Sequence, residues 1–165
     1  MAALTVGTKA PEFELKALDG RRFLLRDELA RGPVVLAFFK VSCPTCQYAF
    51  PFLERLEGAY GHKDVRIIGV SQNDPRDTAD FTKEFGVTFP VLMDDRRNYP
   101  VSNAYGLTNV PTIFWIAQDG DIELASVGWV KADFEEASRK IAESTKTMPA
   151  VLFKPREDVR DFRAG

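Results

Sequence analysis

The chain contains two cysteines, Cys43 and Cys46, and two residues, Pro44 and Thr45, separate them. A continuous apolar run over residues 34–39 comes shortly before the pair, and a pattern typical of a helix follows it. A thiol at the N-terminus of a helix is stabilised as its thiolate, because the amide groups of the first turn point toward it. Since the thiolate is the form that attacks disulfide bonds, this arrangement predicts thiol–disulfide exchange.

The two cysteines are expected to have different roles. Cys43 stands at the first turn and would attack a disulfide or an oxidised sulfur, which gives a mixed disulfide. Cys46 lies one helical turn further on, more buried and less acidic, and would attack that bond to release the reduced product. Pro44 suits a first helical position, where its missing amide hydrogen has no partner to lose, and with Thr45 it is expected to tune the pair. Lys40 is either an electrostatic helper of Cys43 or a solvated side chain at the end of a strand.

A second signal is Pro111, which directly precedes an apolar strand predicted over residues 112–117. A proline at this position denies the strand a hydrogen-bond donor, which is unusual. For a single proline, a trans bond after Val110 is the ordinary interpretation. Together with a C-x-x-C at the start of a helix, a cis Val110–Pro111 bond in a tight turn is the better prediction.

The elements that must position these residues follow from the spacing of apolar residues and from turn signals. Strands are predicted over residues 13–16, 22–25, 34–39, 65–70, 91–93, 112–117 and 122–127. Helices are predicted over residues 46–60, 78–85, 99–105 and 131–145. The first two strands form a hairpin around Asp19 and Gly20. Strands joined through helices are expected to pair in parallel in the middle of the sheet, and the last two strands to pair antiparallel. This order predicts an α/β fold with a mixed central sheet and helices on both faces.

The composition is that of an ordinary soluble globular protein, with 165 residues, of which 45% are apolar and 28% charged. We expect one domain over residues 1–147 and an extended tail over residues 148–165, which shows no period. The net charge of −2 gives no basic surface for nucleic acid or for an anionic membrane. The longest apolar run is too short to cross a bilayer, and the N-terminus shows no secretion signal, so we expect a cytoplasmic protein.

The sequence resembles the thioredoxin superfamily and, within it, the redoxin branch described as alkyl hydroperoxide reductase/thiol-specific antioxidant (AhpC/TSA). The resemblance covers residues 4–145 and is carried by residues 10–15, 19–20, 38–46, 86–91 and 110–112 together with Pro51. It implies a thioredoxin-like three-layer sandwich in which a cis Pro111 packs beside the cysteines and the backbone of Val110 pairs with the substrate. It also implies a thiol-disulfide oxidoreductase that needs no cofactor. Its partners would be a protein or small-molecule disulfide or thiol, and a thiol electron donor.

Two positions depart from the thioredoxin pattern. Thioredoxins carry a buried acid for proton transfer six residues before the first cysteine, where this chain has Ala37. They also usually have a tryptophan directly before that cysteine, where this chain has Ser42. Either change is expected to slow proton movement or to shift the reduction potential.

A peroxiredoxin-like thiol peroxidase is the second hypothesis. In that function, Cys43 would be oxidised to a sulfenic acid and resolved by Cys46. Peroxiredoxins have a Pro-x-x-x-Thr-x-x-Cys run, and Leu36 and Lys40 stand at its proline and threonine positions. The hydroxyl that helps to hold a peroxide is therefore missing, which favours the oxidoreductase.

The third hypothesis is a binding or metal-carrying module whose cysteines do not turn over. A structural zinc site normally needs four ligands. His62 is the only histidine of the chain, so Cys43 and Cys46 would have to borrow carboxylates. We therefore predict no metal site.

Overall fold

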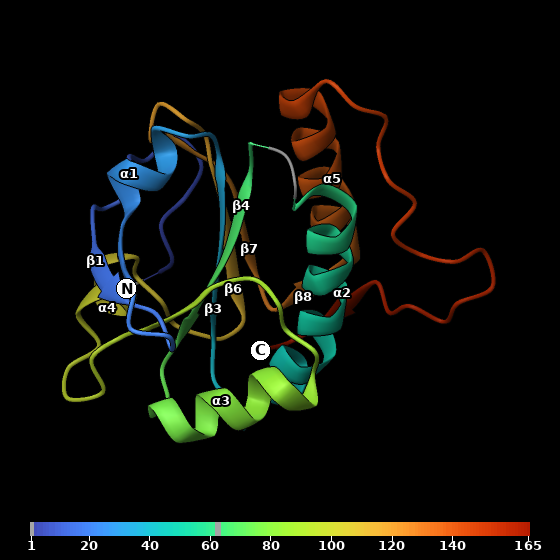
Figure 1. The fold of residues 1–165 in the computed structure, drawn as a ribbon. Coiled ribbons are helices and arrows are strands. Elements are labelled where there is room, and N and C mark those ends of the chain that lie inside the picture. Colours follow the sequence, from blue (N-terminus) through green and yellow to red (C-terminus); the bar gives the residue numbers. More distant parts are fainter. Residues whose placement is uncertain (1, 62–63) are drawn as a thin grey trace.

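A five-stranded mixed sheet with helices on both faces forms the centre of the molecule (Figure 1). The structure is a computed structural model, and it describes residues 2–61 and 64–165. In the sheet order, the strands are β5 (Val91–Met93), β4 (Arg66–Ser71), β3 (Val34–Phe39), β6 (Thr112–Ile116) and β7 (Ile122–Val127). Two further two-stranded sheets consist of β1 (Glu14–Lys16) with β2 (Arg22–Leu24) and of β8 (Trp129–Val130) with β9 (Phe162–Arg163). The helices are α1 (Leu25–Leu29), α2 (Pro44–Tyr60), α3 (Pro75–Glu84), α4 (Pro100–Ala104) and α5 (Lys131–Thr145).

The central sheet has a parallel half and an antiparallel half. β3 pairs in parallel with β4, and β4 pairs in parallel with β5, as predicted. β6 follows helix α4 along the chain but pairs antiparallel with β3, because it enters the sheet at the end where β3 stops, with Thr112 opposite Phe38. The prediction of parallel pairing through helices is therefore wrong for β6. The antiparallel pair β6–β7 and the N-terminal hairpin β1–β2 are confirmed.

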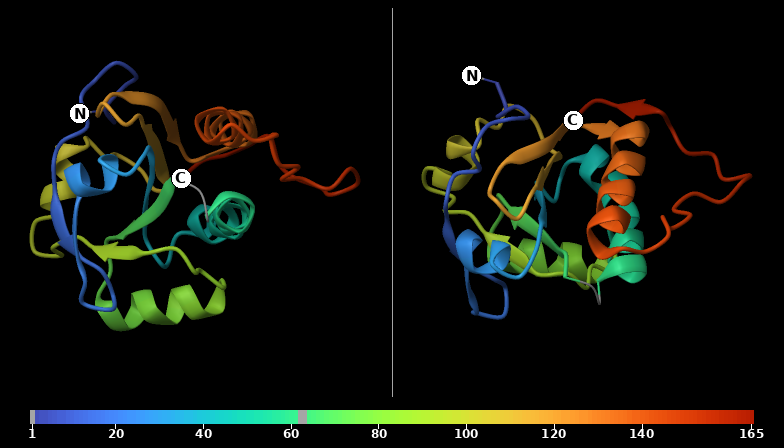
Figure 2. Two further views of the ribbon diagram at one scale, coloured as in Figure 1. Left: turned by 45° about the horizontal axis from the view of Figure 1, so that its top comes forward. Right: turned by 90° about the horizontal axis from the view of Figure 1, so that it is seen from above.

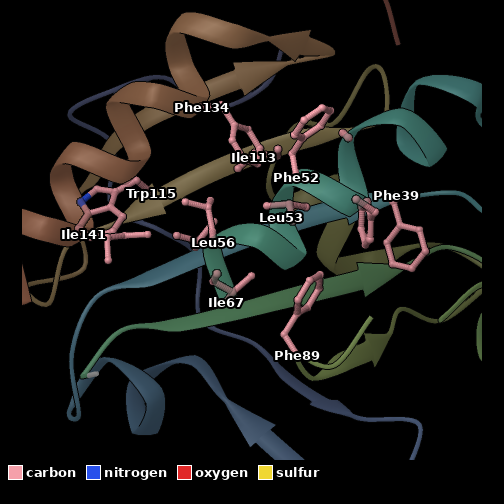
Figure 3. Packing of buried hydrophobic residues seen from close by; sticks show 14 of the residues in the cluster. Phe39, Phe52, Leu53, Leu56, Ile67, Phe89, Ile113, Trp115, Phe134 and Ile141 are labelled. Atoms are coloured by element: carbon pink, nitrogen blue, oxygen red, sulfur yellow. The ribbon is translucent and has the colours of Figure 1, made fainter. Parts of the chain in front are cut away.

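Apolar side chains fill the space on each side of the sheet. β3 is buried along its whole length, as its continuous apolar run predicts. On one face, α2 and α5 cover the sheet with side chains such as Leu53, Leu56 and Ile141 (Figure 3). On the other face, α1, α4 and the hairpin cover it. Because close packing fixes interior side chains, the ends of β3 and β6 give the residues beside them a rigid base.

Two helices begin at prolines, earlier than their apolar spacing indicates. α2 begins at Pro44, and Cys43 is its N-cap residue. α3 begins at Pro75, because the carboxylate of Asp74 accepts the amide hydrogen of Asp77 at 2.8 Å and so caps the first turn. α5 has the predicted bounds.

Residues 148–165 return to the body of the protein. In Figure 2, the segment after α5 extends away from the body of the molecule and then returns to lie beside β8. Its strand β9 pairs antiparallel with β8, with Arg163 opposite Trp129. No period in the sequence predicts α1, β8 or β9, since each contains five residues or fewer. None of the helices in the described part of the chain has the length and apolar character that a membrane crossing requires.

Candidate active site

Cys43 lies at the point where β3 gives way to α2, and its side chain is half-buried. Its Sγ atom accepts the amide hydrogen of Cys46 at 3.2 Å, so the thiol itself caps the helix. The same sulfur lies 3.3 Å from the carbonyl oxygen of Val110, to which its thiol hydrogen donates. This sulfur is therefore held between the first turn of α2 and the loop that precedes β6.

Cys46 lies behind Cys43 in the first turn of α2 and is fully buried in the core. Burial raises the pKa of the Cys46 thiol far above its ordinary value, and a hydrogen bond with the side chain of Cys43 raises it further. At neutral pH, Cys46 therefore stays protonated. The structure agrees with the prediction that Cys46 is the more buried of the two cysteines.

The loop before β6 brings Val110 to the cysteines. The Val110–Pro111 peptide bond is cis, as the resemblance implied. The carbonyl oxygen of Pro111 accepts the amide hydrogen of Gly128 at 2.7 Å, and the hydroxyl of Thr112 donates to the carbonyl oxygen of Asn109 at 2.7 Å. These hydrogen bonds, on both sides of Val110 in the loop before β6, hold Val110 beside the sulfur of Cys43.

The two residues between the cysteines differ in their surroundings. Pro44 is exposed at the first position of α2, as predicted for a proline. Thr45 is buried, and its hydroxyl donates a hydrogen bond of 2.6 Å to the carbonyl oxygen of Ala164, near the end of the chain. The tail segment therefore reaches the C-x-x-C motif, a contact that nothing in the sequence indicates.

A polar cleft of about 230 Å³ adjoins the site and contains the side chains of Lys40 and Gln72. The amide group of Gln72 donates to the hydroxyl of Ser102 at 2.9 Å, and that hydroxyl donates to the carboxylate of Asp94 at 2.7 Å. Asp94 is buried and so fixes the position of Ser102 and, through it, of Gln72. The carbonyl oxygen of Lys40 accepts the amide hydrogen of Cys43 at 3.2 Å, so a residue that lines the cleft is hydrogen-bonded to the backbone of Cys43.

Sequence reasoning finds Lys40 but misses Gln72, Ser102 and Asp94. The only available signal for Asp94 is an acid just after a predicted strand, and this is too common to identify a site. Ala37 stands where thioredoxins carry a buried acidic residue for proton transfer. It is fully buried in β3, and its methyl side chain cannot accept a proton.

The described residues offer little to a metal ion. Across residues 2–61 and 64–165, no group of three or more histidine, cysteine, aspartate or glutamate side chains is placed to hold one. His62, which the metal hypothesis considers, lies outside the described residues.

Comparisons with known proteins agree with this geometry. Residues 6–125 match the AhpC/TSA family. The thiol-disulfide oxidoreductase ResA of Geobacillus thermodenitrificans is 35% identical over 127 residues, which cover 76% of this chain and 71% of the relative. The ResA protein of Halalkalibacterium halodurans is 35% identical over 123 residues, or 74% of this chain and 68% of the relative.

A solved structure shares the architecture. The thioredoxin domain of a thiol-disulfide oxidoreductase from Bacteroides vulgatus superposes with a TM-score of 0.74, over 84% of this chain and 98% of that domain. Its sequence identity is 21%, so this likeness establishes the fold alone. The family match and the curated relatives carry the assignment further: the chain belongs to the AhpC/TSA family, as a thiol-disulfide oxidoreductase with a thioredoxin-like fold.

Proposed function

We propose that Cys43 is the nucleophile and Cys46 the resolving cysteine in an exchange with the disulfide of a protein or a small molecule. The observation that carries this assignment is the contrast between the two sulfurs. Cys43 is half-exposed at the start of a helix, whereas Cys46 is fully buried directly behind it with its pKa raised. Only the first sulfur can meet a substrate, and only the second is placed to attack the resulting bond.

The exchange takes place in two steps. The Cys43 thiolate bonds to one substrate sulfur, and the other substrate sulfur leaves as a thiolate that takes up a proton from solvent. The sulfur of Cys46 then bonds to the Sγ atom of Cys43, the first substrate sulfur leaves, and the proton of Cys46 goes to that leaving sulfur. The two cysteines lose two electrons, and the substrate disulfide gains them.

A thiol donor completes the cycle. It returns two electrons to the Cys43–Cys46 disulfide by the same exchange in reverse, so the reaction needs no bound cofactor. We assign supporting roles to Val110 and Pro111, which hold the loop beside the sulfur, and to Pro44, Thr45 and Lys40 around it. We also propose a cytoplasmic location, because two closely spaced cysteines are typical of a redox pair in a reducing compartment. Cell fractionation tests this last point.

The test of the assignment is the reaction of the pre-reduced protein with 5,5′-dithiobis(2-nitrobenzoic acid), followed by the released thiolate. We expect C46S to keep the rate of the first step, because Cys43 remains. We expect C43S to react at least about 100-fold more slowly, because the remaining thiol is buried and protonated. G58A, which adds a methyl group that meets open space on α2, is the control and should match the wild type. A C43S variant as fast as the wild type would disprove the assignment.

A further inference from the structure

The last residues of the chain, 162–165, which we call the terminal strap, lie against the cysteine motif. The hydroxyl of Thr45 donates to the carbonyl oxygen of Ala164 at 2.6 Å. Gly165 lies so close to the carbonyl group of Val110 that a side chain at this position would collide with it. Both Thr45 and Val110 are close to the sulfur of Cys43. Thr45 is two residues further along the chain, and the carbonyl oxygen of Val110 contacts the sulfur directly. The terminal strap therefore covers the surface on which an incoming substrate would lie.

Contacts with β8 hold the terminal strap in this place. β9 pairs with β8, and the two backbones approach so closely that a Cβ atom on Gly128 would lie 2.6 Å from the carbonyl oxygen of Arg163. Gly128 also has a φ of +77°, which a residue with a side chain rarely adopts. Just before the strap, the indole N–H of Trp129 donates to the carbonyl oxygen of Arg160 at 2.6 Å.

Further contacts fasten the preceding segment to α2. The guanidinium group of Arg55 donates to both carboxylate oxygens of Glu157, at 2.7 and 2.6 Å, and to the carbonyl oxygen of Leu152 at 2.7 Å. Leu152 is itself buried. Since α2 is also the helix that begins at the cysteines, the tail is attached to the same rigid element as the motif.

The position of the terminal strap has a consequence for substrates. A polypeptide disulfide has backbone on both sides of each sulfur, and part of this backbone must lie beside Cys43 during the exchange. Ala164 and Gly165 occupy that space next to Thr45 and Val110. A small disulfide brings no flanking backbone and needs only a path to the sulfur.

The polar cleft provides such a path. It is lined by Lys40, Gln72 and Val110, and the carbonyl oxygen of Val110 contacts the sulfur of Cys43. Its volume of about 230 Å³ suits a compound of a few polar groups and excludes a folded protein. The ammonium group of Lys40 favours a substrate that carries a carboxylate.

We propose that the terminal strap restricts this oxidoreductase to small, polar disulfides by occupying the surface that a polypeptide substrate needs. This inference rests on the proposed function of Cys43. When the strap is seated, small disulfides enter through the polar cleft, and protein disulfides react only through the fraction of molecules whose strap is displaced.

The experiment compares two substrates on pre-reduced proteins, insulin as the polypeptide disulfide and 5,5′-dithiobis(2-nitrobenzoic acid) as the small one. In a variant that ends at Asp161, we expect the rate with insulin to rise by about tenfold or more, because loss of one buried hydrogen bond and its neighbouring contacts shifts the seated population by this order. We expect its rate with the small disulfide to stay within about twofold of the full chain, since that path is already open.

A matched pair of substitutions tests the same point in the full-length chain. G165A adds a methyl group that collides with the carbonyl of Val110, whereas G58A adds one that meets open space on α2. We expect G165A to raise the rate with insulin and G58A to leave it unchanged. If the full chain reduces insulin as fast as both the shortened chain and G165A, the strap proposal is overturned.

A measurement without turnover separates this proposal from the function on which it rests. Alkylation of Cys43 by a maleimide carrying a long polyethylene glycol chain should be faster in the shortened variant, while alkylation by iodoacetamide should be equal in both. Equal rates with the bulky reagent would contradict the strap. Loss of small-disulfide reduction in every variant would instead contradict the proposed function itself.

Discussion

The Sγ atom of Cys43 lies 3.3 Å from the carbonyl oxygen of Val110, although the two residues are 67 positions apart in the sequence. This contact joins the end of the parallel half of the sheet to the start of the antiparallel half. It places the sulfur between a helix N-terminus and a backbone carbonyl. A substrate sulfur bound to Cys43 therefore lies next to the loop that contains Pro111.

The first prediction concerns the selectivity of alkylation. At neutral pH, iodoacetamide should label Cys43 of the native, reduced protein and leave Cys46 unlabelled, because Cys46 is fully buried and its pKa is raised. In denaturant, both cysteines should be labelled. Peptide mass mapping measures the sites, and equal labelling of both cysteines in the native protein would refute the predicted difference in exposure.

The second prediction concerns stability at alkaline pH. In the unfolded chain the Cys46 thiol ionises near its ordinary pKa of 9.0, whereas burial raises this pKa in the folded protein. The native state thus keeps a proton that the unfolded state loses. The contribution of Cys46 to stability is complete below about pH 9 and falls above it, by up to about 1.4 kcal/mol per pH unit.

Urea denaturation of the reduced wild type and of C46A checks this effect. The difference between their free energies of unfolding should be constant from about pH 7 to 8 and should shrink from about pH 9 to 10. The same comparison cancels the contribution of Tyr105, whose pKa burial also raises. A difference that grows with pH would show that the sign is wrong.

The third prediction concerns peroxides. Lys40 stands where peroxiredoxins have a threonine, and the cysteine pair has no hydroxyl at this position to hold a peroxide. Stopped-flow oxidation of the reduced protein by hydrogen peroxide should therefore be no faster than oxidation of free cysteine. A much faster reaction that C43S abolishes would establish the peroxidase hypothesis in place of this expectation.

The fourth prediction concerns the buried carboxylate behind the polar cleft. Asp94 accepts the amide hydrogens of Val101 and Ser102 as well as the Ser102 hydroxyl. D94A should lower the free energy of unfolding by about 2–4 kcal/mol, because it leaves several buried donors without partners. D95A removes a half-exposed acid next to it and should lower the free energy of unfolding much less than D94A does. Urea denaturation of both variants decides the matter, and equal losses would exclude the role given to Asp94.

The sequence predicts the parts of the site that depend on neighbouring residues. An apolar run followed by two cysteines and a helical pattern is sufficient to place Cys43 at the end of β3, because strand and helix periods are local signals. The cis bond before Pro111 is predicted from a proline at the start of a strand, in combination with the C-x-x-C motif. The bounds of α5 follow from apolar residues at helical spacing.

The remaining parts of the site depend on contacts between distant residues. The hydrogen bond from Thr45 to Ala164 spans 119 positions, and the tail that makes it has no period of its own. The polar cleft likewise combines Gln72 after β4 with Ser102 in α4. Side chains from separate elements meet only once the sheet order is known, and the antiparallel entry of β6 is the step that local patterns do not predict.

The most direct test of the central claim is to trap the mixed disulfide. Reduced C46S is treated with bis(2-hydroxyethyl) disulfide, and the product is analysed by mass spectrometry of its peptides. The account predicts a stable adduct on Cys43 in C46S, and a Cys43–Cys46 disulfide without adduct in the wild type. A stable adduct on Cys46 in C43S that forms at the wild-type rate, or a wild type that never forms the internal disulfide, would contradict it.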